Sequence, residues 1–165
     1  MWVKTRGEKE TKEIAGFLAR KFLKKESKHA LIIGLRGELG SGKTAFVQGF
    51  ARALGIKRSL TSPTFLIIRS YKLKNSARRQ VDKNLELLYH IDAYRIKKTN
   101  EMDALGFKEI VRDPKNIVLI EWADKIRKLL PKRTLIINFR HGQQENERII
   151  KIGIKKGNSL LQAML

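Results

Sequence analysis

The sequence predicts an α/β fold built on a mixed parallel and antiparallel sheet. Two observations predict it. Helical spacing of apolar residues alternates with short apolar runs in the first half of the chain. Strand-like segments with alternating apolar residues dominate the second half. The length, 165 residues, is that of one domain with its own core, so we expect a single domain over residues 1–165.

In the first half, the expected elements alternate between helix and strand. Apolar residues spaced along one face predict a helix over residues 11–25, and a short apolar run predicts a buried strand over 30–35. A second helix is expected over 44–54, because Gly55 fits its end. Residues 64–71 are rich in β-branched side chains, which favours a strand.

In the second half, stop signals and alternation define the remaining elements. Residues 72–84 are polar and basic, which indicates a loop or hairpin tip. We then expect a strand over 85–92, a helix over 99–105 stopped by Gly106, a buried strand over 116–121, a helix over 123–130 stopped by Pro131, and strands over 134–139 and 148–154 joined by a polar connection over 141–147. A disordered tail is expected after about residue 155.

Composition narrows the class of protein. The absence of cysteine excludes disulfide scaffolds, thiolate nucleophiles and cysteine-held metal centres. The longest apolar runs have four or five residues, whereas a membrane span needs about 20. Residues 1–12 are charged and carry no apolar core of a secretory signal. We therefore expect a soluble, cytoplasmic protein that does not engage a membrane.

The net charge is strongly positive. Lys and Arg number 36 against 16 Asp and Glu, which gives +20. Such an excess suggests contact with nucleic acid, phosphates or an acidic protein. Solubilising surface charge is the alternative interpretation, and composition alone does not separate the two.

The strongest motif lies between the first predicted strand and the second predicted helix. Residues 37–44 match G-x-x-x-x-G-K-[ST]. Glycines let successive backbone N–H groups point inward at phosphate oxygens, and the helix that follows directs its positive end at the same anion. Lys43 then places a charge on the outer phosphates, and the Thr44 hydroxyl can ligate magnesium. The predicted phosphate-binding residues are Gly37, Glu38, Leu39, Gly40, Ser41, Gly42, Lys43 and Thr44.

Two carboxylates end buried strands and are candidates for the chemistry. Glu121 follows the apolar run 117–120, where the sheet should present its ligand-binding edge. Asp92 ends the stretch 87–91, and it could hold a metal-bound water or orient the attacking water. Alternatively, Glu121 is only the end of a strand. For Asp92, the alternative is a surface turn in which it pairs with Arg95.

Two further features remain open at this point. His90 shares a strand face with Asp92 and could be functional, although a lone strand histidine is more often structural. The hydroxyl cluster over residues 61–64, made rigid by Pro63, could act as a switch loop that senses the outer phosphate. A turn that enters the next strand is the alternative.

Several motifs occur in one order that resembles the bacterial TsaE (YjeE) family. They are the phosphate loop, residues 62–65 (Ser-Pro-Thr-Phe), residues 90–95 (His-Ile-Asp-Ala-Tyr-Arg), Leu105 and Gly106 with Glu109, and residues 119–122 (Leu-Ile-Glu-Trp). The resemblance covers about residues 8–140. Members are small ATPases needed for the threonylcarbamoyl modification of adenosine 37 in tRNAs that read ANN codons.

The resemblance carries implications for fold and site. It implies a compact, three-layer P-loop NTPase-like fold that binds Mg-ATP at the phosphate loop. It places Thr44 and Glu121 at the metal and Asp92 at a position important for hydrolysis and near the metal. It places Thr11 where members approach the nucleotide base. Ala45 and Ala123 depart from the family pattern, in which a hydroxyl residue and a proline are frequent, and neither departure removes a proposed ligand.

The resemblance also implies partners. The family works with the transferase TsaD and its scaffold TsaB, with tRNA in the complex, and its ATPase is thought to reset that complex between turnovers. Hydrolysis by the isolated protein is expected to be slow when a partner completes the site. The basic segment 72–84 is either a solvated loop or a contact to tRNA phosphates or an acidic partner patch. Its cations include Lys72, Lys74, Arg78, Arg79 and Lys83.

Two other functions compete with this reading. A small P-loop kinase of a metabolite or nucleoside would share the loop and could use Arg78, Arg79 and Arg95 in a lid, but no acceptor site is legible. A nucleic-acid-binding module with a degenerate loop is disfavoured because Lys43 and Thr44 are both retained.

Overall fold

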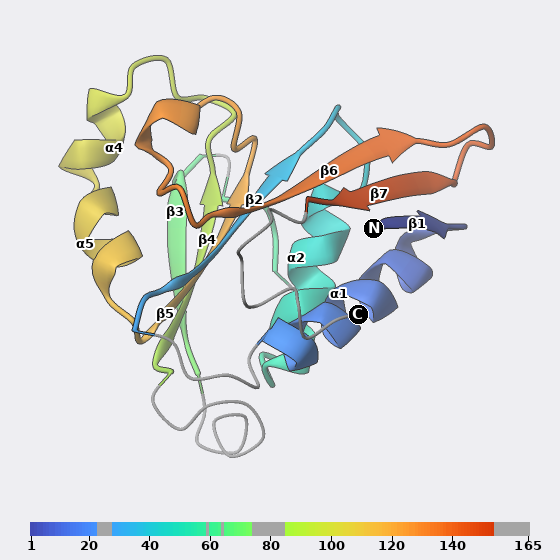
Figure 1. Ribbon diagram of the computed structural model, residues 1–165, viewed down its shortest axis with the longest axis horizontal. Coiled ribbons are helices and arrows are strands. Elements are labelled where there is room, and N and C mark those ends of the chain that lie inside the picture. The colour runs from blue at the N-terminus through green and yellow to red at the C-terminus, as the bar shows by residue number, and fades with distance from the viewer. Residues whose placement is uncertain (23–27, 59, 64, 74–84, 154–165) are drawn as a thin grey trace.

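The computed structural model describes residues 1–22, 28–58, 60–63, 65–73 and 85–153. Its described strands form one seven-stranded sheet in the order β1-β7-β6-β2-β5-β4-β3 (Figure 1). The strands are β1 (Trp2–Thr5), β2 (Leu31–Arg36), β3 (Ile68–Lys72), β4 (Leu87–Asp92), β5 (Asn116–Glu121), β6 (Leu135–His141) and β7 (Arg148–Ile152).

The predicted mixed sheet is confirmed. β2 runs parallel to β5 and β6, and β4 runs parallel to β5. The outer pairs β3–β4, β6–β7 and β1–β7 are antiparallel. Because β2, β4 and β5 are parallel, their carboxyl ends share one edge, and the register sets Glu121 beside both Leu35 and Asp92. The fold therefore brings the two candidate carboxylates together beside the phosphate loop.

Helices cover both faces of the sheet, which confirms a three-layer α/β fold (Figure 1). On one face lie α1 (Glu8–Phe22) and α2 (Lys43–Ala53), and on the other lie α4 (Asn100–Ala104) and α5 (Phe107–Arg112). Successive side chains of β5 point to opposite faces of the sheet and so pack in the two cores in turn. Ile117 and Leu119 pack in the α1–α2 core, whereas Val118 and Ile120 pack in the α4–α5 core.

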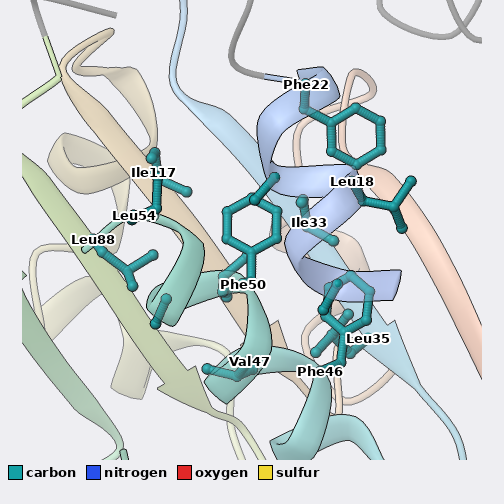
Figure 2. Close-up of a cluster of buried hydrophobic side chains, with 14 of the residues drawn as sticks. Leu18, Phe22, Ile33, Leu35, Phe46, Val47, Phe50, Leu54, Leu88 and Ile117 are labelled. Atoms are coloured by element: carbon teal, nitrogen blue, oxygen red, sulfur yellow. The ribbon is translucent and has the colours of Figure 1, made fainter. Parts of the chain in front are cut away.

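The α1–α2 core holds the larger group of buried aromatic side chains. Figure 2 shows Leu18 and Phe22 of α1 meeting Phe46 and Phe50 of α2 above Ile33 of β2. Phe46 also meets Phe139 of β6 edge-on, with ring centroids 5.7 Å apart. This packing fixes α2, and with it the residues at its first turn.

The two helices approach closely at Gly49. A Cβ at this position would collide with the Lys12 carbonyl oxygen of α1 and lie 2.5 Å from the Lys12 Cα. Gly16, on the facing side of α1, has ordinary spacing, because a Cβ there would lie 3.7 Å from the Gly49 carbonyl oxygen. Gly49 therefore sets the distance between α1 and α2.

The predicted helix over residues 123–130 is wrong. The chain makes turns there and a single 3-10 turn, η1 (Arg127–Leu129). Trp122 takes a left-handed φ of 56°, and the Ala123 N–H donates to the Leu35 carbonyl at 3.1 Å instead of entering a helix. The apolar spacing of Ala123 and Ile126 reflects burial against the α4–α5 core, which turns satisfy equally well.

The predicted strand over residues 64–71 starts too early. The Pro63 carbonyl accepts the N–H groups of Leu66 and Ile67, and Ile67 has a φ of 63°. This turn delays β3 until Ile68. Thr64 lies outside the described residues, so the hydroxyl cluster is described at residues 61–63 alone.

The remaining elements agree with expectation apart from their ends and two omissions. The helix predicted over 11–25 is α1, with residues 23–27 outside the described part. The sequence patterns did not predict β1 or α5. Helix α5 begins directly after Gly106, which has a φ of 71°. Most of the basic segment 72–84 and the tail after residue 155 lie outside the described residues. Among the described helices, none has the length and apolar character to cross a membrane.

Candidate nucleotide-binding site

The phosphate loop connects β2 to α2 and takes a backbone path that only glycine follows easily. Gly37, Gly40 and Gly42 have φ values of 144°, 72° and 99°. At Gly37, a Cβ would collide with the Phe139 carbonyl oxygen and lie 2.9 Å from the Ser41 Oγ. Ser41 Oγ donates to the Glu38 carbonyl at 2.7 Å, which closes the loop. The sequence pattern therefore folds as the motif predicts.

The loop ends at the N-terminus of α2. Gly42 is the N-cap residue and supplies no side-chain acceptor, and Lys43 and Thr44 form the first turn. The first N–H groups of a helix have no intrahelical acceptor, and the helix dipole adds partial positive charge at this end. The geometry is that of an anion site.

Lys43 lies over the loop with its ammonium held in place. Its Nζ donates to the carbonyl oxygens of Gly37 at 2.8 Å and Glu38 at 2.7 Å. The same atom lies 3.9 Å from the centroid of the Trp122 ring. Burial lowers the pKa of Lys43 from 10.5, although attraction to the carboxylates of Glu121, Asp92 and Asp124 opposes the shift.

Glu121 connects Thr44 to His90. Its Oε2 accepts the Thr44 hydroxyl at 2.8 Å, and its Oε1 lies 2.8 Å from His90 Nε2. His90 is fully buried and Glu121 is 3% exposed. The other ring nitrogen, His90 Nδ1, has no hydrogen-bond partner within the described residues. Nε2 is therefore assigned as the donor, and His90 fixes the orientation of the carboxylate.

Asp92 lies at the next strand end, where Ser62 and Tyr94 are donors to it among the described residues. Its Oδ2 accepts the Ser62 hydroxyl at 2.5 Å, and its Oδ1 accepts the Tyr94 N–H at 2.9 Å. Ser62 comes from the segment Thr61–Pro63, so this hydrogen bond joins the predicted switch segment to the predicted hydrolytic acid.

These groups surround one cavity of about 380 Å³. Lys43, Thr44, Asp92 and Glu121 all line it, so the structure gathers the four residues predicted to carry the chemistry. Tyr94 and Trp122 add an aromatic wall, with ring centroids 5.0 Å apart. Sequence reasoning gave these two aromatic residues no role, and their signal was their place in the two motifs, within two residues of the acids.

Thr11 and Arg95 are placed differently from the other candidates. Thr11 is fully buried, and its hydroxyl donates to the Gly7 carbonyl at 3.0 Å and lies 2.9 Å from the Thr5 hydroxyl. Its methyl group lies beside Gly42, so its contact with the nucleotide base stays a prediction. The Arg95 guanidinium lies over the Phe65 ring, 4.3 Å from the centroid.

The donor set fits magnesium. Within the described part of the chain, no three His, Asp or Glu side chains gather as a complete metal cage. Mg²⁺ seldom uses such a cage, because it keeps several waters and takes one or two carboxylates together with phosphate oxygens. A threonine hydroxyl 2.8 Å from a carboxylate oxygen, next to an anion-binding loop, supplies these oxygen ligands.

A phosphate loop at the edge of a mixed α/β sheet, with an acid at the end of the neighbouring strand, defines a P-loop protein. The family model described as "Threonylcarbamoyl adenosine biosynthesis protein TsaE" matches residues 5–150. The chain belongs to the TsaE family, as its motifs predicted.

Relatives and a solved structure agree with this assignment. The chain is 38% identical over 117 residues to the tRNA threonylcarbamoyladenosine biosynthesis protein TsaE of Bacillus subtilis (strain 168), a match that covers 70% of this chain and 66% of that protein. It is 34% identical to the Rickettsia typhi protein of the same name, with 93% of each chain covered. The crystal structure of Bacillus subtilis YdiB superposes with a TM-score of 0.67 at 31% identity, covering 99% of this chain and 90% of that chain.

Proposed function

We propose that this protein binds Mg-ATP, hydrolyses it to ADP and phosphate, and acts in the cytoplasm as an accessory factor for threonylcarbamoyl modification of adenosine 37 in tRNA. The observation that carries the proposal is the Thr44–Glu121 hydrogen bond, which joins the phosphate loop to an acid across the cavity from Lys43. The names of its relatives, tRNA threonylcarbamoyladenosine biosynthesis proteins, supply the pathway.

The loop and Lys43 bind the phosphates. The N–H groups at the start of α2 face the anion, and Lys43 contributes a full charge at the outer phosphates. Its ammonium is already buried against two loop carbonyls, so its position is set before the nucleotide arrives. Binding therefore costs little ordering of this long side chain.

Thr44 and Glu121 would hold the metal, which neutralises charge on the phosphates when bound. His90 holds one carboxylate oxygen of Glu121, so the other is aimed at Thr44. Such outer partners fix the orientation of a ligand and are themselves sensitive to substitution.

Asp92 is the proposed positioning group for the attacking water. Ser62 and the Tyr94 N–H hold its carboxylate at the cavity wall. No arginine lines this cavity among the described residues. We propose that hydrolysis is slow in the isolated protein and that TsaD and TsaB, with tRNA, complete the site, because phosphoryl transfer gains much from an added cation.

The test is ATP binding and release of free phosphate, measured for the protein alone and then with TsaD, TsaB and tRNA. Wild type should bind ATP with magnesium, and phosphate release should rise in the complex. Lys43→Ala should lose ATP affinity while its circular dichroism spectrum stays that of wild type. Unchanged affinity in that folded variant would remove the loop from the function. Transfer of phosphate to a small acceptor, without free phosphate, would favour a kinase instead.

A further inference from the structure

Among the described residues, no α-helix covers one face of the sheet region formed by β1, β7 and the carboxyl-terminal parts of β6 and β2, whereas the earlier part of β2 is covered there, since Ile32 packs in the α4–α5 core. α1 and α2 lie on its other face, and α4 and α5 lie over the β5–β4–β3 half (Figure 1). Leu35, Phe139 and Ile150 point into the α1–α2 core. Because side chains alternate along a strand, their neighbours Arg36, Asn138 and Lys151 point to the opposite face, which we name the open face.

A continuous row of side chains crosses the open face. Pairing in the sheet places Arg36 beside Asn138, Asn138 beside Lys151, and Lys151 beside Trp2. These four positions belong to four adjacent strands. They line a surface hollow of about 720 Å³, together with Arg140 and residues of the phosphate loop. This hollow borders the phosphate loop at Gly37 and Glu38, but it shares no lining residue with the nucleotide cavity, which Lys43 and Glu121 line.

The hollow carries a net positive charge, because Arg36, Arg140 and Lys151 line it against the single carboxylate of Glu38. The side chains of Arg36, Arg140 and Lys151 form no hydrogen bond or ion pair with any residue that the structure describes, and Arg36 Nε is a buried donor without an acceptor there. Lys4, on the neighbouring strand, is by contrast paired with Glu147. Three unpaired cations in one concave surface attract an anion that carries several charges.

The hollow also presents an aromatic ring. Trp2 is 55% exposed, and Lys151 Nζ lies 4.6 Å from its ring centroid. A tryptophan so exposed on a sheet surface gains from burial against a flat apolar partner. An unpaired nucleobase supplies that partner, and the phosphates on either side of it match the cations.

We propose that the open face binds an unpaired segment of RNA, with a base stacked on Trp2 and phosphates on Arg36, Arg140 and Lys151. An acidic peptide would satisfy the cations but would leave the tryptophan exposed, so RNA is the better occupant. The choice of tRNA as the natural RNA rests on the proposed function. The face itself is defined by charge and stacking alone.

The experiment measures binding of a fluorescein-labelled tRNA transcript by anisotropy over a range of salt concentrations. Trp2→Ala should lower affinity at least about fivefold, the lower end of a base–aromatic stack, and Trp2→Phe should recover most of it. Arg140→Ala with Lys151→Ala should flatten the slope of log affinity against log salt by about 1.4, or about 0.7 for each lost phosphate contact. A fully paired RNA duplex should be insensitive to the Trp2 change.

The matched control removes two exposed cations from another part of the surface, as Lys97→Ala with Lys128→Ala. It should leave affinity and slope unchanged. The proposal is overturned if the control variant loses as much tRNA affinity as the test variants, or if Trp2→Ala loses none. It is also overturned if wild type does not bind tRNA, or if polyglutamate competes with the tRNA as well as unlabelled tRNA does. ATP affinity, measured on the same proteins, should match wild type throughout. If wild type binds no ATP but the tRNA pattern holds, the proposed function fails and the RNA surface stands.

Discussion

Burial of Lys43 at the proposed binding site lowers the stability of the folded protein. Its ammonium is buried against the Gly37 and Glu38 carbonyls, and burial lowers its pKa despite the nearby acids. A buried charge that is only partly compensated costs folding free energy. The proposed site therefore holds a cation at the phosphate loop, and this burial lowers the stability of the fold.

The first prediction concerns the pH dependence of this cost. In the folded protein the pKa of Lys43 lies below 10.5. At pH values between this lowered pKa and 10.5, the unfolded chain therefore binds more protons at Lys43 than the folded protein does. Stability therefore rises with pH across that window, and Lys43→Met removes the effect. The difference in unfolding free energy, wild type minus variant, should increase as pH rises toward 10.5 in urea titrations without nucleotide. A flat or falling difference would contradict the burial argument.

The second prediction separates the two acids. Glu121 bonds to Thr44, so Glu121→Gln should weaken ATP binding in magnesium and leave magnesium-free binding unchanged. Asp92→Asn keeps the shape held by Ser62 and the Tyr94 N–H, so it should spare binding and lower turnover by about 100-fold or more. Calorimetry with and without magnesium and a phosphate-release assay measure both. Equal losses of Glu121→Gln with and without magnesium would refute its role at the metal.

At the scale of the element, α2 has two functions that share its packing. Its first turn carries Lys43 and Thr44, and its middle carries Phe46 and Phe50 into the core (Figure 2). The contact of Gly49 with Lys12 of α1 fixes how closely the two helices pack. A shift of α2 would therefore move the phosphate loop as well as the core.

The third prediction tests this contact. Gly49→Ala inserts a methyl group against backbone of α1, and overpacking of this kind costs about 1–3 kcal/mol of unfolding free energy. Gly16→Ala is the matched control, because its Cβ finds ordinary space and alanine favours the helix by about 1 kcal/mol. Alanine favours α2 at position 49 by the same amount, so urea unfolding should place Gly49→Ala below Gly16→Ala in stability by about 1–3 kcal/mol. If both changes prove neutral, the helix spacing is adjustable and Gly49 does not set it.

At the scale of the whole molecule, the sheet positions the main parts of the proposed nucleotide site. The loop after β2, the acid at the end of β5 and the acid at the end of β4 come from three adjacent parallel strands. A ligand that bridges these strand ends ties together segments far apart in the sequence. Its binding should therefore stabilise the complete fold.

The fourth prediction gives this effect a size. At 100 times the dissociation constant, ATP with magnesium should add about 2.7 kcal/mol to the folded state. For a domain of this size, that corresponds to a rise in melting temperature of about 5–10 °C. Thermal denaturation measures it, and Lys43→Ala should lose most of the shift. A melting temperature that ATP does not change would count against the binding site as drawn.

The sequence alone determined the local features of this protein. The phosphate loop, the apolar runs of β2 and β5, and the acids at the ends of β4 and β5 are each written in a few consecutive residues, because glycine conformation and strand burial are local properties. The order of motifs was enough to identify the family. Local patterns failed where tertiary contacts decided, as at residues 123–130, where Ala123 bonds to Leu35 and the expected helix does not form.

Only the tertiary structure decided which residues meet. Lys43 lies against Trp122, which is 79 positions away in the sequence, and Ser62 bonds to Asp92, which is 30 positions away. Glu121 contacts His90 and Thr44, which are 31 and 77 positions away. The row from Trp2 to Arg36 on the open face likewise needs four strands in register. Strand order and register follow from burying two apolar faces at once, a condition that the whole chain satisfies together and no short segment encodes.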